Sequence, residues 1–168
     1  MTDQATGASE RPENPSAVGS PVQRPVRPHS AAGGVLCPYC GSEAKLVGGL
    51  AIYPHRPDLG GKKFWRCKPC DAYVGCHEAG NGQGDGTKPL GRLANAELRK
   101  AKKDAHYAFD RLWLDSPNRR RARGAAYAWL ADAMGLTADE CHIGEMDVQQ
   151  CRQVFRLVVA RKAAGTVA

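Results

Sequence analysis

The sequence of 168 residues has few aromatic side chains and no long apolar run. Aromatic residues make up 7% of the chain, whereas glycine occurs 19 times and proline 11 times. A composition of this kind predicts a modest hydrophobic core and a large share of loop. No apolar segment approaches the roughly 18 residues that a membrane helix needs, and the first residues lack the apolar core of a signal peptide. The sequence therefore predicts a soluble, cytoplasmic protein that does not cross a membrane.

Residues 1–35 have the weakest capacity to fold. They contain five of the prolines but no aromatic residue and no cysteine, and their three arginines balance three acidic residues. Such a segment cannot bury enough apolar surface to offset the entropy of ordering it. We predict a disordered tail over residues 1–35, and the net charge of +7 must come from the residues that follow.

The seven cysteines are an odd number, and four of them form two C-x-x-C pairs, Cys37 with Cys40 and Cys67 with Cys70. Without an export signal, this spacing is more typical of metal ligands than of disulfides. Residues 41–66 leave room for strands between two zinc knuckles. Thiolates suit Zn²⁺, and four protein ligands leave no open coordination position, so we predict one structural Zn²⁺. An iron site has the same spacing and stays an alternative, whereas a redox pair would need a lone C-x-x-C in a thioredoxin-like context.

Cys76 and His77 follow Cys70 closely and raise a question about the ligand set. Either residue could replace a predicted ligand or begin a second metal site. The simpler interpretation is that Cys76 ends a strand and His77 enters a loop.

Hydrophobic patterning divides the chain into a β part and a helical part. Four short β-like runs are present, at residues 44–47, 50–53, 62–66 and 72–76. Strands this short are not stable without a cross-link such as a metal. We therefore predict an α+β protein: a small zinc ribbon over residues 36–78, a flexible Gly-rich linker over 79–91, and a basic three-helix region over 92–163.

Three helices are expected in the helical region. The first covers residues 93–114, and the second has Ser116 as its N-cap, Pro117 as its first helical residue and a mostly alanine buried face. Asp147 and Gln150 form a capping-box pair at the start of the third helix. That helix is predicted to bury one apolar face, formed by Val148, Cys151, Val154, Phe155 and Val158.

Several segments together resemble a family of phage and bacterial proteins described as zinc-finger-containing domains of unknown function. The segments are CPYCG at 37–41, VGCH at 74–77, PLGRLANAEL at 89–98, AHYAFDRLW at 105–113, AYAWLADAMG at 126–135 and CHIGEMD at 141–147. The resemblance covers about residues 37–158 and implies a zinc-binding module fused to a small helical region, often encoded by mobile elements. It implies no established activity and no catalytic residues.

The helical region carries most of the basic excess, with fourteen lysines and arginines against nine acidic residues after residue 91. Its densest cluster lies in the first turns of the second predicted helix, where the positive end of the helix dipole disfavours cations. Phosphate groups would offset this cost, since guanidinium groups bind them through paired hydrogen bonds. The candidate nucleic-acid residues are Arg119, Arg120, Arg121 and Arg123, together with Lys100, Lys102 and Lys103 of the first predicted helix. A solvated arginine cluster paired with Asp115 and nearby acidic residues is the alternative.

Aromatic residues flank the zinc knuckles and could either stack on bases or cover the metal. They are Tyr39, Phe64, Trp65 and Tyr73, with Lys62, Lys63 and Arg66 nearby. Because aromatic residues beside a structural metal usually pack over it, we favour the packing role.

The predicted function is that of a zinc-binding accessory protein, related to phages or mobile elements, which contacts nucleic acid, DNA in preference to RNA, through basic helices and is not an enzyme. A protein-interaction adaptor with a structural zinc is the first alternative. A metal-dependent nuclease is the second. It would use His106 and Asp110, which lie one helical turn apart, with His77 and His142 brought near them by folding.

Overall fold

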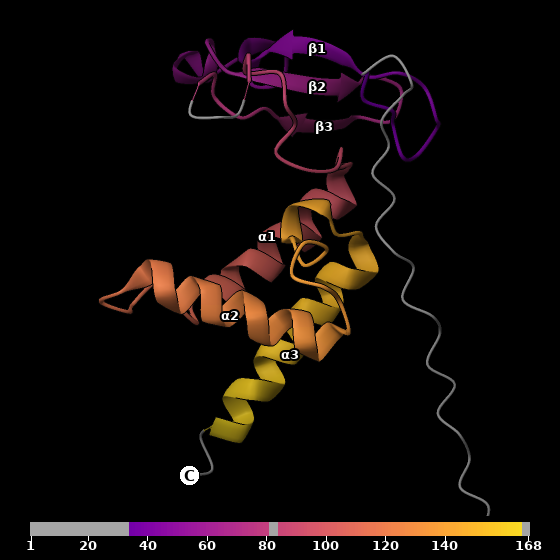
Figure 1. Ribbon diagram of the computed structural model, residues 1–168. Helices are drawn as coiled ribbons and strands as arrows, with labels where there is room; N and C mark the ends of the chain where they lie inside the picture. The colour runs from indigo at the N-terminus through magenta and orange to yellow at the C-terminus, as the bar shows by residue number, and fades with distance from the viewer. Residues whose placement is uncertain (1–33, 81–83, 166–168) are drawn as a thin grey trace, which may run out of the picture.

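The computed structural model describes residues 34–80 and 84–165, and the α+β prediction is confirmed. A three-stranded antiparallel sheet comes first and three helices follow it (Figure 1). The predicted disordered tail lies outside the described residues except for its last two positions. Gly34 and Val35 are buried, and the Val35 carbonyl accepts a hydrogen bond of 2.8 Å from the Ala44 amide, so the ribbon begins before residue 36.

The sheet consists of β1 (Lys45–Gly48), β2 (Lys63–Cys67) and β3 (Ala72–Gly75), in the order β1-β2-β3. Its register pairs Leu46 with Trp65 and Trp65 with Val74, so these three side chains lie on one face. The other face has Lys45, Arg66 and Tyr73 in cross-strand register. The loop that enters β1 and the turn between β2 and β3 therefore meet at one end of the sheet (Figure 1).

The prediction of a strand over residues 50–53 is wrong. This segment begins with a 3-10 turn, η1 (Gly49–Ala51), and a second turn, η2 (Pro57–Leu59), packs against it. The backbones approach so closely that a Cβ on Gly49 would lie 1.9 Å from the Leu59 carbonyl oxygen. Only glycine fits there, and the chain turns back instead of extending the sheet.

The described part of the predicted flexible linker lies along β3. The His77 amide donates to the Lys88 carbonyl at 2.8 Å, and the Leu90 amide donates to the Gly75 carbonyl at the same distance. Tyr73 and Ala94 exchange hydrogen bonds of 3.0 and 3.1 Å. The open edge of β3 supplies backbone partners, which hold this glycine-rich segment in place and lead the chain directly into the first helix.

The helices are α1 (Ala96–Asp110), α2 (Arg119–Met134) and α3 (Val148–Gly165), with a 3-10 turn, η3 (Ile143–Glu145), before α3. The first helix is shorter than predicted because the Asn95 side chain caps it, accepting from the Leu98 amide at 3.0 Å. The predicted N-cap of the second helix is also displaced. Asn118, rather than Ser116, accepts a hydrogen bond of 3.1 Å from the Arg121 amide.

The capping box of the third helix is confirmed. The Asp147 amide donates to the Gln150 side chain at 3.0 Å, and the Gln150 amide donates to the Asp147 carboxylate at 2.8 Å. One predicted member of the buried face is wrong, because Phe155 is 42% exposed. It lies in a groove between α1 and α3 instead of in the core.

Two separate clusters of buried side chains form the core. The larger cluster joins the three helices and includes Phe109, Leu130, Ile143, Val154 and Val158. The smaller one lies in the ribbon and consists of Val35, Cys37, Ala44, Cys67, Ala72 and Leu93. Among the described residues, no helix combines the length and the apolar character that a membrane crossing requires.

Candidate metal centre

The first knuckle is a tight turn that contains Cys37 and Cys40. The Gly41 amide donates to the Cys37 carbonyl at 2.9 Å, and the Cys37 amide donates to the Ser42 carbonyl at 2.8 Å. Gly41 has a φ of 72°, a left-handed conformation that glycine adopts without steric cost. The turn aims both sulfur atoms toward the same point at the end of the sheet.

The second knuckle repeats this turn at the end of β2, with Cys67 and Cys70 as its cysteines. Asp71 occupies the position of Gly41 and has a φ of 44°, the one positive φ of a non-glycine residue in the described part of the chain. Aspartate tolerates this region better than most residues. The Asp71 amide closes the turn by donating to the Lys68 carbonyl at 3.2 Å.

The four cysteines converge, and their sulfur atoms lie within 4.8 Å of one another. The Sγ atoms of Cys40 and Cys67 are 3.6 Å apart. Four sulfurs at about 2.3 Å from a tetrahedral Zn²⁺ would be about 3.8 Å from each other, so the arrangement fits the ion. Cys37 and Cys67 are buried, whereas Cys40 is exposed. Neither Cys76 nor His77 belongs to the cluster, which consists of the four cysteines of the two C-x-x-C pairs.

The pKa values of Cys40, Cys67 and Cys70 indicate why a bound cation would stabilise the cysteine cluster. Hydrogen bonds from Ser42 lower the pKa of Cys40 to about 6. The neighbouring Cys40 sulfur, with burial, raises the pKa of Cys70 to about 12, and burial raises the pKa of Cys67. The cluster cannot hold four thiolates side by side without a compensating charge. A bound Zn²⁺ would supply that charge and release protons from the thiols, which would couple metal binding to folding of the ribbon.

Helix α1 is attached to the second knuckle through Arg99. One guanidinium nitrogen donates to the Asp71 carbonyl at 2.8 Å, and the other donates to the Asp71 carboxylate at 3.0 Å. The guanidinium carbon also lies 4.2 Å from the centre of the Tyr73 ring. Sequence reasoning missed this contact, although an aspartate directly after the second C-x-x-C pair could have indicated a charged partner.

Tyr39 makes the matching attachment at the first knuckle. Its hydroxyl accepts a hydrogen bond of 3.1 Å from the Asn95 amide, the residue that caps α1. Tyr39 is 42% exposed, and Trp65 packs against the ribbon core and donates to the Thr87 carbonyl at 2.7 Å. These two residues thus have structural partners, as the packing role requires.

Phe64 and Tyr73 lie on the opposite face of the sheet from Trp65. Both make edge contacts with Tyr53, a residue that sequence reasoning did not single out. Tyr53 also donates a hydrogen bond of 3.2 Å to the Tyr73 hydroxyl. The three rings support one another on the side of the sheet that carries Lys45 and Arg66.

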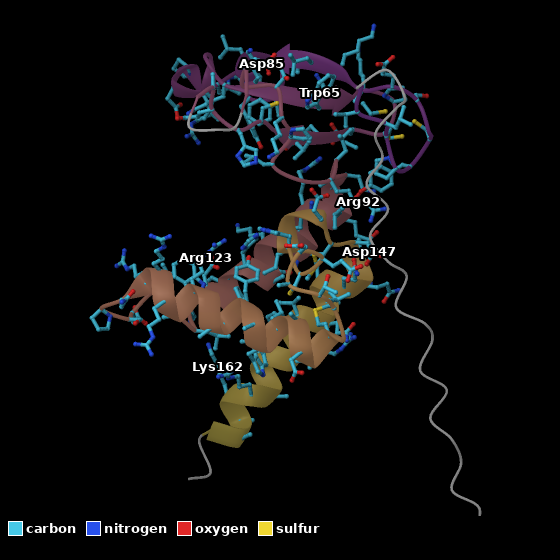
Figure 2. The ribbon with its side chains drawn as sticks, in the orientation of Figure 1. Trp65, Asp85, Arg92, Arg123, Asp147 and Lys162 are labelled. Carbon is cyan, nitrogen blue, oxygen red and sulfur yellow. The ribbon has the colours of Figure 1, made fainter. Side chains whose placement is uncertain are left out.

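The candidate arginines lie at the start of α2, and the structure leaves them on the surface. Arg119 donates through Nε to the Leu114 carbonyl at 2.9 Å, and Arg123 lies 4.8 Å from the centre of the Tyr127 ring. Figure 2 places Arg123 well away from the end of the sheet that carries the knuckles. None of the four arginines forms an ion pair with Asp115 or another acidic residue in the described part of the chain.

The three candidate lysines have different environments. Lys103 is exposed, and Lys100 forms an ion pair of 2.7 Å with Asp104. Lys102 is largely buried, and its Nζ donates to the carbonyls of Arg92 at 3.1 Å and Gly144 at 2.6 Å. Burial lowers its pKa to about 8. Lys100 and Lys103 lie in the first half of α1, whereas the arginines lie in the first turns of α2.

Lys102 belongs to a joint between two distant segments. A Cβ on Gly91 would lie 2.3 Å from the Gly144 oxygen, so the two backbones touch. The Arg92 amide also donates to the Gly144 carbonyl at 3.0 Å. The segments PLGRLANAEL and CHIGEMD, which carry much of the family resemblance, meet at this point. Their glycines could have indicated a close backbone contact.

The remaining candidates do not assemble into a second metal group within the described residues. His106 Nδ1 lies 3.7 Å from Asp110 Oδ1, as expected for residues one turn apart. His142 instead contacts the ring of Tyr127, and His77 lines a pocket of about 350 Å³ beside Lys62 and Lys63.

Comparison with known proteins also supports a metal centre at the four cysteines. A family model described as a zinc-finger-containing domain matches residues 34–161. No curated protein and no solved structure matches the chain. The match includes both knuckles, the segment along β3 and most of the three helices, and together with the cysteine cluster it supports zinc binding. This chain therefore belongs to the family of zinc-finger-containing domains.

Proposed function

We propose that this protein is a zinc-binding accessory protein that contacts nucleic acid, DNA in preference to RNA, through the arginines at the start of α2. The zinc ion has a structural role in this proposal, because its four cysteines leave no position for a substrate. The observation that carries the proposal is the exposed cluster of Arg119, Arg120, Arg121 and Arg123.

The position of these arginines is costly unless an anion binds nearby. The N-terminus of a helix carries a partial positive charge, which disfavours each nearby cation by a few tenths of a kcal/mol. Arg120 and Arg121 have no acidic partner among the described residues. A phosphate backbone would offset both the dipole and the mutual repulsion of the arginines.

The preference for DNA follows from the shape of the contact element. The major groove of B-form DNA admits an α-helix, while the major groove of A-form RNA is too narrow for side chains to enter. Helix α2 exposes its arginines at one end, where they can reach phosphates on both sides of a groove. Lys100 and Lys103 are secondary contacts in this proposal, and Lys102 is not a contact because its Nζ already donates to the carbonyls of Arg92 and Gly144.

A salt titration tests the proposal. Binding to a fluorescent 20-base-pair duplex should weaken steeply between 50 and 200 mM salt, with a slope set by the number of phosphates contacted. The Arg120→Gln/Arg121→Gln variant should reduce that slope by about 2, because each lost phosphate contact changes it by about 1. Both side chains are exposed, so the substitutions should leave the fold intact.

A variant with the same change of charge provides the control. Arg56→Gln/Lys62→Gln removes two cations of the ribbon that are already paired with Asp58 and Glu78. It should keep the wild-type slope. If the wild-type protein does not bind the duplex at 50 mM salt, or if both variants behave alike, the proposed contact is wrong. Single-stranded DNA and an RNA duplex of the same length test the preference for duplex DNA.

A protein-interaction adaptor is the second candidate, because α1 and α3 leave between them a groove with an exposed aromatic side chain among charged residues. The groove has a volume of about 600 Å³, and the exposed Phe155 lines it together with Ala101 and Arg156. A partner protein that co-purifies in a fixed ratio, and that is lost in Phe155→Asp, would support this function. Unchanged co-purification in the variant would place the partner elsewhere.

Two further parts of the predicted function have direct tests. Metal-dependent nicking of DNA that disappears in His106→Ala would support a nuclease activity. The relation to phages or mobile elements rests on the sequence resemblance, and the genes beside this one would test it.

A further inference from the structure

A second basic surface lies on the ribbon, beside the zinc knuckles. It is a groove of about 400 Å³ between β1 and the second knuckle. Val47 and Pro69 give it apolar walls, and Lys45, Arg66 and Lys68 provide three cations against one acid, Glu43. Its volume is in the range of ligand-binding pockets. None of these residues belongs to the arginine cluster at the start of α2. The groove is therefore a separate surface from the arginine cluster that carries the proposed function.

The cations of this groove are held close together by the sheet itself. Lys45 and Arg66 are direct cross-strand neighbours, and like charges in that position destabilise a sheet. Lys68 follows two residues after Arg66, between the two cysteines of the second knuckle. The register therefore imposes a repulsion that a bound anion would relieve.

The described residues offer these cations little compensation. Lys45 and Lys68 are exposed and form no ion pair there. Arg66 donates through one terminal nitrogen to the Ala51 carbonyl at 2.8 Å. Its Nε is buried and has no hydrogen-bond partner in the described part of the chain. A buried donor without a partner costs free energy, so this cation is poorly compensated by its surroundings.

We propose that this groove binds the phosphate backbone of the DNA strand, as a second contact surface in addition to α2. The inference rests on the proposed function, because it assumes that DNA is the ligand. Lys45 and Lys68 pair with successive phosphate oxygens, and Val47 and Pro69 contact the deoxyribose between them. Ribbon and helices then bind one DNA molecule together.

DNA binding by this groove should also depend on the zinc ion. Cys67 lines it, and Lys68 and Pro69 lie between the two zinc ligands of the second knuckle. Loss of the metal releases this turn and dismantles the groove. Contacts from α2 do not depend on the knuckle, since the buried residues of the helical core form a cluster of their own. DNA binding therefore has one zinc-dependent part and one zinc-independent part.

The test compares two double variants in the duplex-binding assay. Lys45→Gln/Lys68→Gln should lower the salt slope by about 2 relative to wild type. The control, Lys62→Gln/Lys63→Gln, removes the same charge from the same ribbon. Its residues lie near the start of β2, on the order of 15 Å along the strand from Lys68. This control should keep the wild-type slope. Zinc content and circular dichroism establish that both variants are folded.

Removal of zinc provides a second test of the proposal. Chelation should lower the slope of the wild-type protein by about 2, and it should not lower the slope of Lys45→Gln/Lys68→Gln any further. A wild-type slope in that variant, or an equal loss in the control, overturns the inference. If Arg120→Gln/Arg121→Gln then still weakens binding, the proposed function stands without the groove. If the wild-type protein does not bind DNA, both fail.

Discussion

Removal of the metal should unfold the ribbon and leave the helices folded. The perturbation is chelation of Zn²⁺ from the full chain, or the substitution Cys70→Ser, which removes one of the four ligands. We expect residues 34–78 to lose their structure and α1, α2 and α3 to keep most of theirs. The reason is that the ribbon core has few buried apolar side chains, whereas the helical core has many.

The ribbon core is too small to replace the metal. Apart from cysteines and alanines, its buried side chains are Val35 and Leu93. Burial of a side chain of this kind contributes about 1.5–3 kcal/mol. Structural Zn²⁺ contributes on the order of 10 kcal/mol or more in small zinc domains. The metal therefore contributes more than the two side chains together, and the sheet cannot persist without it.

The helical core has no cysteine ligand and many more apolar side chains. Phe109, Leu130 and Val154 are fully buried in it, and they come from three different helices. Attachment to the ribbon through Arg99 and Tyr39 is polar and lies at the start of α1. Loss of the ribbon should fray this end of α1 without exposing the core.

Hydrogen exchange measured by mass spectrometry resolves the two parts. Peptides from residues 34–78 should exchange at the rate of an unfolded chain after chelation, whereas peptides from residues 119–158 should stay protected. Cys76→Ser is the matched control, because Cys76 lies in the ribbon but outside the cluster, and it should keep both zinc and protection. Protection of the ribbon without metal would refute the reasoning, as would simultaneous loss of the helices.

The other predictions concern single side chains and the metal itself. Elemental analysis of the purified protein should find one zinc per chain, and iron in its place would contradict the assignment. Arg99→Met should weaken zinc binding about tenfold or more in a competition with a chromogenic chelator, because Arg99 holds the residue after Cys70, and Lys103→Met should not. The folded chain releases the Lys102 proton near pH 8, while the unfolded chain keeps it to about pH 10.5. The unfolded state thus binds more protons between these values, and the free energy of unfolding should rise with pH there by up to about 1.4 kcal/mol per pH unit. Urea unfolding should show this rise in wild type and not in Lys102→Met.

Much of the fold and the metal centre could be predicted from short stretches of sequence. The ligand set follows from the two C-x-x-C pairs, because each pair closes a turn within a few residues. The capping box of Asp147 and Gln150 is equally local, since its two hydrogen bonds join residues three positions apart. The strand predicted at residues 50–53 failed because Gly49 packs against Leu59, a contact that residues 50–53 do not reveal.

The sequence by itself determined the local features: the two C-x-x-C pairs of the metal centre, the α+β order of elements and the basic character of α2. Only the tertiary structure decided what distant residues do together. It joined Lys102 by a hydrogen bond to a carbonyl 42 positions away, paired Asp71 with an arginine 28 positions away, and placed Lys45 beside Arg66 in the groove. Turns and helix caps depend on neighbours in the chain, whereas these contacts depend on how the sheet pairs and the helices pack. That difference explains why spacing predicted the metal centre, and why the groove beside it became visible only in three dimensions.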